Sequence, residues 1–450
     1  MPTNPIVLVH GYSSEAAAFD TWKSILLREG FAASRIHACS YRSLTNEVTI
    51  SDIAEAFDRA LRVQAGLDND EPFDAIVHST GMLVIRAWLC AYAGRRNRLK
   101  HLIGLAPATF GSPLAHKGRS WLGAMFKGNR SLGPDFLEAG DRILAGLELG
   151  SRYTWDLAHE DVLASDTFYG PSNRTPYAFI FCGTGTFPGL RRLAQEPGAD
   201  GAVRWAGCAL NARKIVLDLT RDPAREESTK RISVAPWNNV DAPLIPVAGK
   251  NHSSILRNPG DGLIDMVMSA LSVNSEASYA EWNRDAQGRS AAATKGMDLW
   301  QQFVIRALDE RGDPITDYNV QLFTRTARGR ESAVQPFDID VHAYRDDPSL
   351  RCFHVNLSKI GIDKLENLWI RVMASSGSQL VGYLGYGSEG AGMSSDGDED
   401  MWDAELDISS LADDTGVKFF YPFTTTLVEL RLNREPLPAQ GRNQVCFFPD

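Results

Sequence analysis

Hydrophobic and polar positions along the first 275 residues follow two alternating periods. Short apolar runs such as "IVLVHG" (6–11) and "YAFIFCGTG" (177–185) end at glycine and predict buried parallel strands. Between them, "TISDIAEAFDRALRVQAG" (49–66) repeats apolar residues at helical spacing and predicts an amphipathic helix. The same patterns predict further strands at 34–42, 73–77, 99–113 and 212–220, and further helices at 19–30, 82–94 and 260–273. Strands that alternate with helices predict a mostly parallel sheet covered on both faces.

The pattern changes after residue 275. Residues 276–297 are polar and small, which is typical of a connection between domains. Beyond them, short runs of period two are separated by Asp, Gly and Pro, as in "WQQFVIRALDERGDPITDYNVQLFTRT" (300–326), and predict an antiparallel β-sandwich. We therefore predict an α/β domain over 1–275, a linker over 276–297 and a β-sandwich domain over 298–450.

Composition and charge exclude some classes of protein. The 450 residues are 44% hydrophobic and 23% charged, as in an ordinary globular protein, and the formal net charge is -10. This acidic balance argues against a nucleic-acid partner, because phosphate binding needs a dense basic surface. No run approaches the roughly 18 apolar residues of a membrane helix. We see no signal peptide, so we expect a cytoplasmic location, with leaderless export as the alternative.

The six cysteines are scattered and show no metal-ligand spacing, so we predict buried thiols and neither a metal nor a cofactor. A disulfide between Cys182 and Cys208 is the alternative. The acidic tract at 387–403 is interpreted as a flexible loop. Calcium binding by its clustered carboxylates is the less favoured reading, because their spacing matches no EF-hand loop; these residues are Asp396, Asp398, Asp400 and Asp403.

The candidate nucleophile is Ser79, which lies between the predicted strand "FDAIV" and the predicted helix "MLVIRAWLCAYAG". A serine at such a tight corner has its Oγ lifted clear of the sheet, and the next backbone N–H points to the same place. Gly81 suits the close passage of the helix over the strand. Val77 departs from the small residue that this turn prefers. The competing reading is a strand–turn–helix with a capping serine.

Three further elements accompany Ser79. In "LVHGYSS" (8–14) a His-Gly turn follows the first strand, and the N–H groups of Tyr12 and Thr80 would form an oxyanion hole. The side chain of His10 is expected to have a structural role. In "EPGADGAVRWAG" (196–207), Asp200 lies in an Asp-Gly loop after a late strand and is the preferred acid. The rival carboxylates, which fit structural roles, are Asp218, Asp222 and Asp241.

The candidate base is His252 in "PVAGKNHSSILRNP" (246–259), because the order Ser, Asp, His leaves no other histidine in the α/β half. Together these residues describe acyl transfer. Ser79 attacks an ester carbonyl, His252 moves the proton, Asp200 orients the imidazole, and water then hydrolyses the acyl-enzyme.

The chain resembles the α/β-hydrolases of the lipase and esterase kind. The matching pieces are "LVHGYSS", "HSTGM", "GLAPATFGSPLA", "DGAVRWAG" and "NHSSI", which span about residues 5–260. The resemblance implies the same triad and the same oxyanion donors. Val77 and Met82 depart from the small residues that are more frequent in the lipase pattern. Residues 296–450 show no resemblance that we recognise.

The long insertion at about 114–170 predicts a helical cap or lid. It carries Trp121, Leu122, Met125 and Phe126 on one predicted helix face, and a cap of this kind would enclose an apolar acyl pocket and open at a lipid surface. An ordinary helical subdomain without gating is the alternative. We predict a serine carboxylester hydrolase that acts on acyl esters or lipids. A phospholipase or an intracellular polyester depolymerase is the close rival, and a non-catalytic scaffold that binds a protein through its β domain is the rival of another class.

Overall fold

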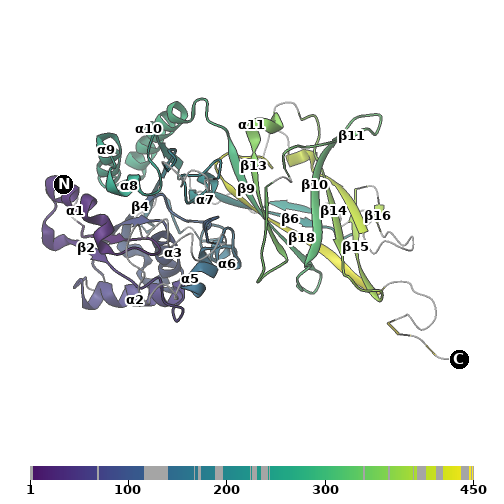
Figure 1. The fold of residues 1–450 in the computed structure, drawn as a ribbon, viewed down its shortest axis with the longest axis horizontal. Coiled ribbons are helices and arrows are strands. Elements are labelled where there is room, and N and C mark those ends of the chain that lie inside the picture. Colours follow the sequence, from purple (N-terminus) through teal and green to yellow (C-terminus); the bar gives the residue numbers. More distant parts are fainter. Residues whose placement is uncertain are drawn as a thin grey trace. The chain divides into compact units, whose positions relative to one another are not determined.

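The structure is a computed structural model in which the chain folds into two compact units (Figure 1). The first unit comprises residues 1–212 and 237–297, and the second comprises 213–236 and 298–450. The described residues are all except 1–3, 68–69, 116–139, 167, 171–173, 188–195, 223, 225–230, 235–241, 243, 338–339, 363–364, 389, 393–401, 412–418, 437–444, 447 and 449–450.

The first unit is built on a six-stranded sheet in which every pair of neighbours is parallel. In spatial order the strands are β2 (Ile36–Cys39), β1 (Ile6–Val9), β3 (Phe73–His78), β4 (Leu99–Leu105), β5 (Tyr177–Gly183) and β8 (Leu244–Val247). The central strands are buried on both faces, which explains their continuous apolar runs. In a parallel sheet, all carboxyl ends reach the same edge, so the loops after β1, β3, β5 and β8 converge there.

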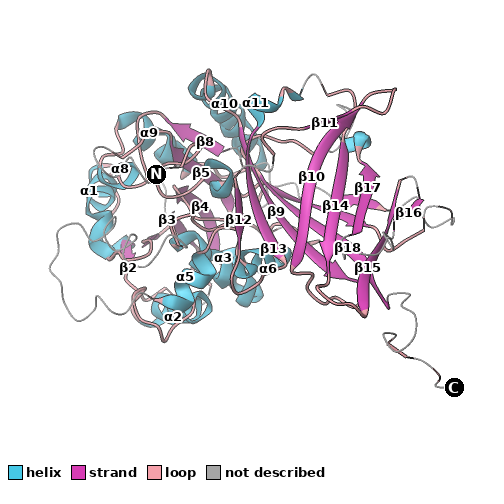
Figure 2. Cartoon of the chain, turned by 45° about the vertical axis from the view of Figure 1, so that its right-hand side comes forward, coloured by secondary structure: helices cyan, strands magenta, loops and turns pink. Residues whose placement is uncertain are grey.

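The helices of this unit lie around its strands, as Figure 2 shows. They are α1 (Asp20–Arg28), α2 (Ile50–Val63), α3 (Gly81–Ala91), α5 (Asp141–Leu147), α6 (Arg152–Glu160), α7 (Trp205–Cys208), α8 (Ser254–Arg257), α9 (Asp261–Ala270) and α10 (Glu276–Thr294). Short 3-10 turns lie at Ala16–Phe19, Ala33–Arg35 and Ala93–Arg98.

Each face of the sheet has its own apolar packing. On one face, alternate residues of β1 and β5, such as Leu8 and Phe181, belong to the same core cluster as Trp22 of α1 and Val267 of α9. On the other face, the ring of Trp88 in α3 lies edge-on to Phe73 of β3 and to a phenylalanine of α2. Two helical layers therefore enclose the parallel sheet, as the alternating pattern predicts.

The second unit is formed by two sheets around a separate apolar core. One sheet has four strands, β11 (Glu331–Ala333), β10 (Asp317–Arg325), β14 (Trp369–Ser375) and β17 (Trp402–Asp407), and all of its described pairs are antiparallel. The other sheet has eight strands, β12 (Val341–Ala343), β13 (Leu350–Asn356), β9 (Trp300–Asp309), β18 (Thr425–Pro436), β15 (Val381–Gly387), β16 (Gly390–Gly392), β6 (Ala212–Asp218) and β7 (Ile232–Val234). The helix α11 (Leu357–Ile360) and a 3-10 turn at Ser409–Leu411 complete the unit. The pair β9–β18 is parallel, so the sandwich is not wholly antiparallel.

Three predicted assignments differ from the structure. The strand predicted at 212–220 forms, but it pairs with β18 and β7 in the second unit, where Ile215 and Leu217 enter the core. An alternating apolar pattern identifies a strand but not the sheet that it joins.

The predicted linker at 276–297 is helical over most of its length, because α10 packs Tyr279 and Trp282 into the core of the first unit. The hydroxyl of Tyr279 also donates to the carbonyl of Ala178 in β5 at 3.0 Å. The segment 387–403, predicted as one loop, contributes to β15, β16 and β17 at its ends. Among the described residues, none of the helices combines the length and the apolar character that a membrane span requires.

Candidate active site

Ser79 occupies the turn between β3 and α3. Its φ is +53°, in the left-handed region that non-glycine residues seldom adopt, and the residue is 6% exposed. The carbonyl of Ser79 accepts hydrogen bonds from the N–H groups of Met82 at 3.1 Å and Ala108 at 3.0 Å. A strained residue persists only where its surroundings hold it, and such residues cluster at functional sites. The local backbone therefore has the strained conformation that the predicted nucleophile turn requires.

Two glycines allow the backbone to approach Ser79 closely. A Cβ at Gly81 would lie 2.5 Å from the carbonyl oxygen of Val9, and a Cβ at Gly11 would lie 2.7 Å from the Cβ of Ser79. Any side chain at either position would overlap with these atoms. The turn after β1 therefore packs directly against Ser79, and Tyr12 is the next residue along that turn.

The unusual Val77 lies beside a glycine of the neighbouring strand. Val77 is fully buried and lies in register with Val9 of β1 and Gly104 of β4. A Cβ at Gly104 would lie 2.9 Å from the Cε of Met82. The space that the missing side chain of Gly104 leaves is therefore filled by Met82, together with Ile180 and Pro107. The departure from the lipase pattern at Met82 is therefore accommodated by a glycine on β4, in register with Val77.

The His-Gly turn is held by the ring of His10, which is fully buried. Its Nδ1 lies 2.7 Å from the carbonyl oxygen of Gly11, and its Nε2 lies 3.2 Å from the backbone nitrogen of Tyr41. Nε2 therefore accepts the N–H of Tyr41, and Nδ1–H donates to Gly11, which is the neutral form that burial favours by lowering the pKa of His10. The carbonyl of Gly11 and the N–H of Tyr12 point in opposite directions across one trans peptide, so fixing the first fixes the second.

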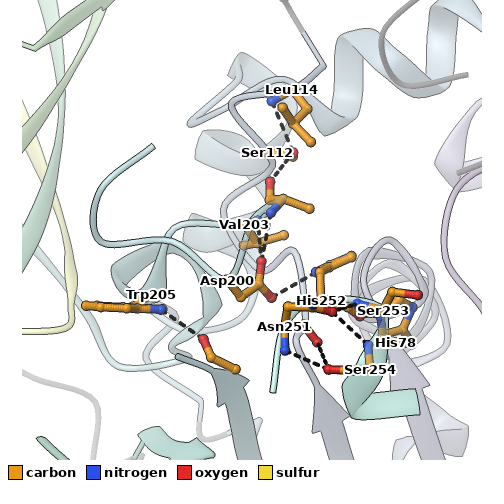
Figure 3. A network of polar contacts seen from close by, with 12 residues as sticks. His78, Ser112, Leu114, Asp200, Val203, Trp205, Asn251, His252, Ser253 and Ser254 are labelled. Carbon is orange, nitrogen blue, oxygen red and sulfur yellow. Dashed lines mark hydrogen bonds and ion pairs between the residues drawn. The ribbon is translucent and has the colours of Figure 1, made fainter. Parts of the chain in front are cut away.

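Asp200 lies in a loop that is anchored to the end of β5. Its Oδ1 accepts the backbone N–H groups of Ala202 at 2.9 Å and Val203 at 2.8 Å. The indole N–H of Trp205 donates to the carbonyl of Gly183 at 3.0 Å and holds the loop at the carboxyl end of the strand. One carboxylate oxygen of Asp200 therefore fixes its own turn, and Oδ2 points away toward His252, as Figure 3 shows.

His252 follows β8 and faces Asp200. The Nδ1 of His252 lies 2.9 Å from the Oδ2 of Asp200, both side chains are fully buried, and the N–H of His252 donates to the carbonyl of Asp200 at 2.9 Å. The side chain of Asn251 accepts the N–H groups of Ser253 and Ser254 and fixes the start of α8. Because Nδ1 faces a carboxylate, Nδ1 carries a proton, and Nε2 is the nitrogen from which the ring can accept another.

The rival carboxylates have other surroundings. Asp218 ends β6 in the second unit, and its Oδ1 accepts the N–H of Thr220 at 3.0 Å. Asp222 caps its own turn by accepting the N–H of Ala224 at 2.8 Å. Asp241 lies outside the described residues. The geometry therefore favours Asp200 among the described candidates.

Ser79 is linked to His252 through the residue that precedes it. The Nε2 of His78 lies 2.8 Å from the carbonyl oxygen of His252, and the two rings are 4.6 Å apart (Figure 3). The structure thus brings Asp200 and His252 together and connects the loop of His252 to the turn of Ser79. The catalytic roles of Ser79, Asp200 and His252, and of the N–H groups of Tyr12 and Thr80, stay predictions.

A buried ion pair that the sequence analysis missed joins α3 to the insertion. The guanidinium of Arg86 contacts both carboxylate oxygens of Asp161, at 2.7 and 2.8 Å, with both side chains fully buried. Tyr169 donates to the same carboxylate at 2.8 Å, and Arg86 also donates to the carbonyl of Thr109 at 2.5 Å. The isolated Arg in an apolar helix was the only signal for it. The described part of the insertion, with α5 and α6, is therefore tied to the helix that follows Ser79.

The remaining predicted features divide between described and undescribed residues. The lid residues Trp121, Leu122, Met125 and Phe126 lie outside the described residues, as do Asp396, Asp398 and Asp400. Asp403 lies in β17 with an exposed side chain. All six cysteines are free, which excludes the disulfide between Cys182 and Cys208. These two and Cys352 are buried as predicted, whereas Cys39 and Cys90 are partly exposed and Cys446 is exposed.

A parallel sheet enclosed by helices, a strained serine between strand and helix, and a buried Asp–His pair at the same edge define the class of the first unit, which has the α/β-hydrolase fold. No protein-family model matches the chain, and no curated protein matches it. Among solved structures, the phospholipase PlaB from Legionella pneumophila aligns with a TM-score of 0.79 and 23% identity over 96% of this chain and 94% of that chain. The same phospholipase in complex with thio-NAD aligns with a TM-score of 0.76 at 23% identity and the same coverage. At this identity the likeness establishes the fold, and it covers the β unit as well as the α/β unit.

Proposed function

We propose that the chain is a serine carboxylester hydrolase. The observation that carries this proposal is the buried pair of His252 and Asp200, 2.9 Å apart, on loops at the carboxyl edge of the sheet that carries the strained Ser79. A serine alcohol becomes a useful nucleophile only when a positioned base takes its proton. The order of these residues along the chain, and their places after β3, β5 and β8, support this assignment.

The proposed mechanism is acyl transfer in two halves. The Oγ of Ser79 attacks the ester carbonyl while the Nε2 of His252 takes its proton, and the same nitrogen then protonates the leaving alcohol. Asp200 holds the Nδ1 proton and stabilises the imidazolium. The N–H groups of Tyr12 and Thr80 hold the oxyanion. Water, activated by His252, then attacks the acyl-enzyme, releases the acid and returns Ser79 to its hydroxyl form.

The substrate that we propose is an ester with a hydrophobic acyl chain. A solved structure that aligns with both units is a phospholipase, and we therefore include phospholipids beside simple acyl esters in the proposal. The apolar residues of the insertion support an acyl pocket that contacts a lipid surface. The cytoplasmic location predicted from the sequence stays a prediction.

The test measures hydrolysis of chromogenic esters of graded acyl length and of phosphatidylcholine vesicles. We expect wild type to hydrolyse at least one series, and S79A to lose at least about 10⁴-fold in kcat. The matched control is S24A, because Ser24 is an exposed serine of α1 whose hydroxyl donates to the carbonyl of Asp20 in the same helix. Hydrolysis of phosphatidylcholine in preference to the soluble esters would favour the phospholipase reading. A wild type that is inactive on every substrate, or an S79A variant with full activity, would leave the non-catalytic scaffold as the better account.

A further inference from the structure

His78 is a buried histidine that the proposed mechanism does not use. It is the last residue of β3, it directly precedes Ser79, and it is 6% exposed. One side of its ring faces the base loop, where Nε2 lies 2.8 Å from the carbonyl oxygen of His252. The other side faces the turn after β1, where a Cβ at Gly11 would lie 3.3 Å from Nδ1. One ring therefore lies between the turn that carries Tyr12 and the loop of the candidate base.

The chemistry of this contact fixes the tautomer of His78. A carbonyl oxygen can only accept a hydrogen bond, so the Nε2 of His78 must carry a proton. Burial lowers the pKa of His78 well below its usual value, and the nearby His252, His10 and Arg257 lower it further. The ring is therefore neutral, and its single N–H is committed to the backbone of His252. A neutral ring held in this way is a fixed donor.

The backbone of His252 is thereby held from two sides. Its N–H donates to the carbonyl of Asp200 at 2.9 Å, and its carbonyl accepts from His78 at 2.8 Å. Asp200 also sets the direction of the imidazole through Nδ1. The contact with Asp200 ties His252 to the acid loop, whereas the contact with His78 ties it to the strand that ends just before Ser79.

We propose that His78 is a positioning residue, which sets the separation between the nucleophile turn and the base loop by bonding the carbonyl of His252 from the position adjacent to Ser79. This inference rests on the proposed function for its catalytic consequence. The structural part of the inference, that His78 holds the backbone of His252 in place, is independent of the proposed function. A misplacement of about 1 Å between reacting groups costs about 100-fold in rate.

The experiment compares H78Q with H78N. The amide nitrogen of Gln reaches about as far from the backbone as the Nε2 of His, whereas that of Asn ends one bond earlier and cannot reach the carbonyl of His252. We expect H78N to lower kcat for ester hydrolysis by about 100-fold with little change in KM. We expect H78Q to recover most of that loss. If general destabilisation caused the loss, H78Q would not recover activity relative to H78N, because the two amide side chains differ by only one methylene.

A second readout does not depend on activity. The proton between Nδ1 of His252 and Asp200 is expected to give a low-field NMR resonance, identified by its loss in H252Q. It should persist in wild type and H78Q and be lost to solvent exchange in H78N. H101Q is the control, since it removes another buried His–Asp contact remote from His252 in the sequence and should change neither kcat nor this resonance.

The outcomes separate the two proposals. If wild type hydrolyses no ester but the resonance follows the Gln and Asn pattern, the proposed function fails and the positioning role of His78 stands. If H78N keeps both the rate and the resonance of wild type, or if H78Q is as impaired as H78N, the positioning role is wrong whatever the activity. An equal loss of rate in H101Q would also overturn it, because the effect would then follow from lost stability.

Discussion

Two buried His–Asp pairs lie at opposite ends of the same parallel sheet. His252 and Asp200 follow the carboxyl ends of β8 and β5, with Nδ1 and Oδ2 at 2.9 Å. His101 and Asp74 lie near the starts of β4 and β3, with Nδ1 and Oδ1 at 2.6 Å. The residue types and the distances are alike, so a buried His–Asp pair does not by itself mark an active site. The position of the pair on the sheet is the better guide, because ligands bind outside the carboxyl ends of the strands in such sheets. The pair of His252 and Asp200 lies at that end.

The second nitrogen of each histidine sharpens the difference. The Nε2 of His101 lies 2.6 Å from the carbonyl oxygen of Val273, so both of its nitrogens face acceptors and both must carry protons. Burial opposes this charge, but the hydrogen bond and the charge of Asp74 outweigh it and raise the pKa of His101. His101 therefore holds its proton more tightly than a free imidazole and fastens the chain after α9 to the sheet. His252, protonated toward Asp200, keeps the tautomer that a general base needs.

The largest effect on the rate is expected from replacing histidine by glutamine in the pair at the carboxyl end of the sheet, with the same replacement at the other end as its control. H252Q should lower kcat/KM for ester hydrolysis by at least about 10⁴-fold, because Gln cannot accept and return the proton. H101Q should stay within a few-fold of wild type in the same assay. A large loss of rate in H101Q at a temperature where the variant is folded would remove the distinction between the two ends.

The next effect concerns stability at the carboxyl end. D161N leaves the buried Arg86 guanidinium without its counter-charge, and we expect a loss of about 3–5 kcal/mol in the free energy of unfolding. The matched control is D156N in α6, whose carboxylate meets Arg152 at 2.8 Å on the surface and should contribute about 0–1 kcal/mol. Urea denaturation measures both variants. Equal losses would show that burial of the Arg86 pair contributes nothing of its own.

The smallest effect is the pH dependence of the His101 pair. Its pKa is raised on folding, so the stability that it contributes is fully present below the unfolded value of about 6.5 and is lost as the pH rises through the folded value. The difference in unfolding free energy between wild type and H101Q should therefore shrink as the pH increases above about 6.5. The other histidines titrate in both proteins and largely cancel in this difference. Urea denaturation between pH 5.5 and 9 measures this difference. A difference in unfolding free energy that grew with pH would contradict the raised pKa of His101.

Local patterns predicted most of the α/β unit from the sequence. The helix over 49–66 forms as α2, because Thr49 and Asp52 provide the capping box that the apolar period requires. The strand–Ser79–helix turn follows from an apolar run that ends where a helical period begins. The strict order Ser, Asp, His directed attention to Asp200 and His252, which the structure brings together.

Long-range partners were not predictable in this way. The pattern of β6 specifies a strand, but its partner β18 lies far along the chain and leaves no local mark. The sequence of α10 does contain a signal for a helix, because apolar residues recur at helical spacing at Tyr279, Trp282 and Ala286. The small polar residues around them outweighed this signal in the prediction of a linker. His78 and Arg86 act through atoms of distant segments, His252 and Asp161, so only the folded structure shows what they contact.

The insertion of β6 and β7 between two stretches of the first unit has a consequence for synthesis on the ribosome. The segment 213–236 is made about 200 residues before β18, the strand with which β6 pairs. At about 5–20 residues per second, the nascent chain carries β6 for roughly 10–40 s without that partner. During this interval the apolar side chains of Ile215, Leu217 and Leu219 lack the core that later covers them. This segment is therefore where we expect a chaperone to bind the emerging chain.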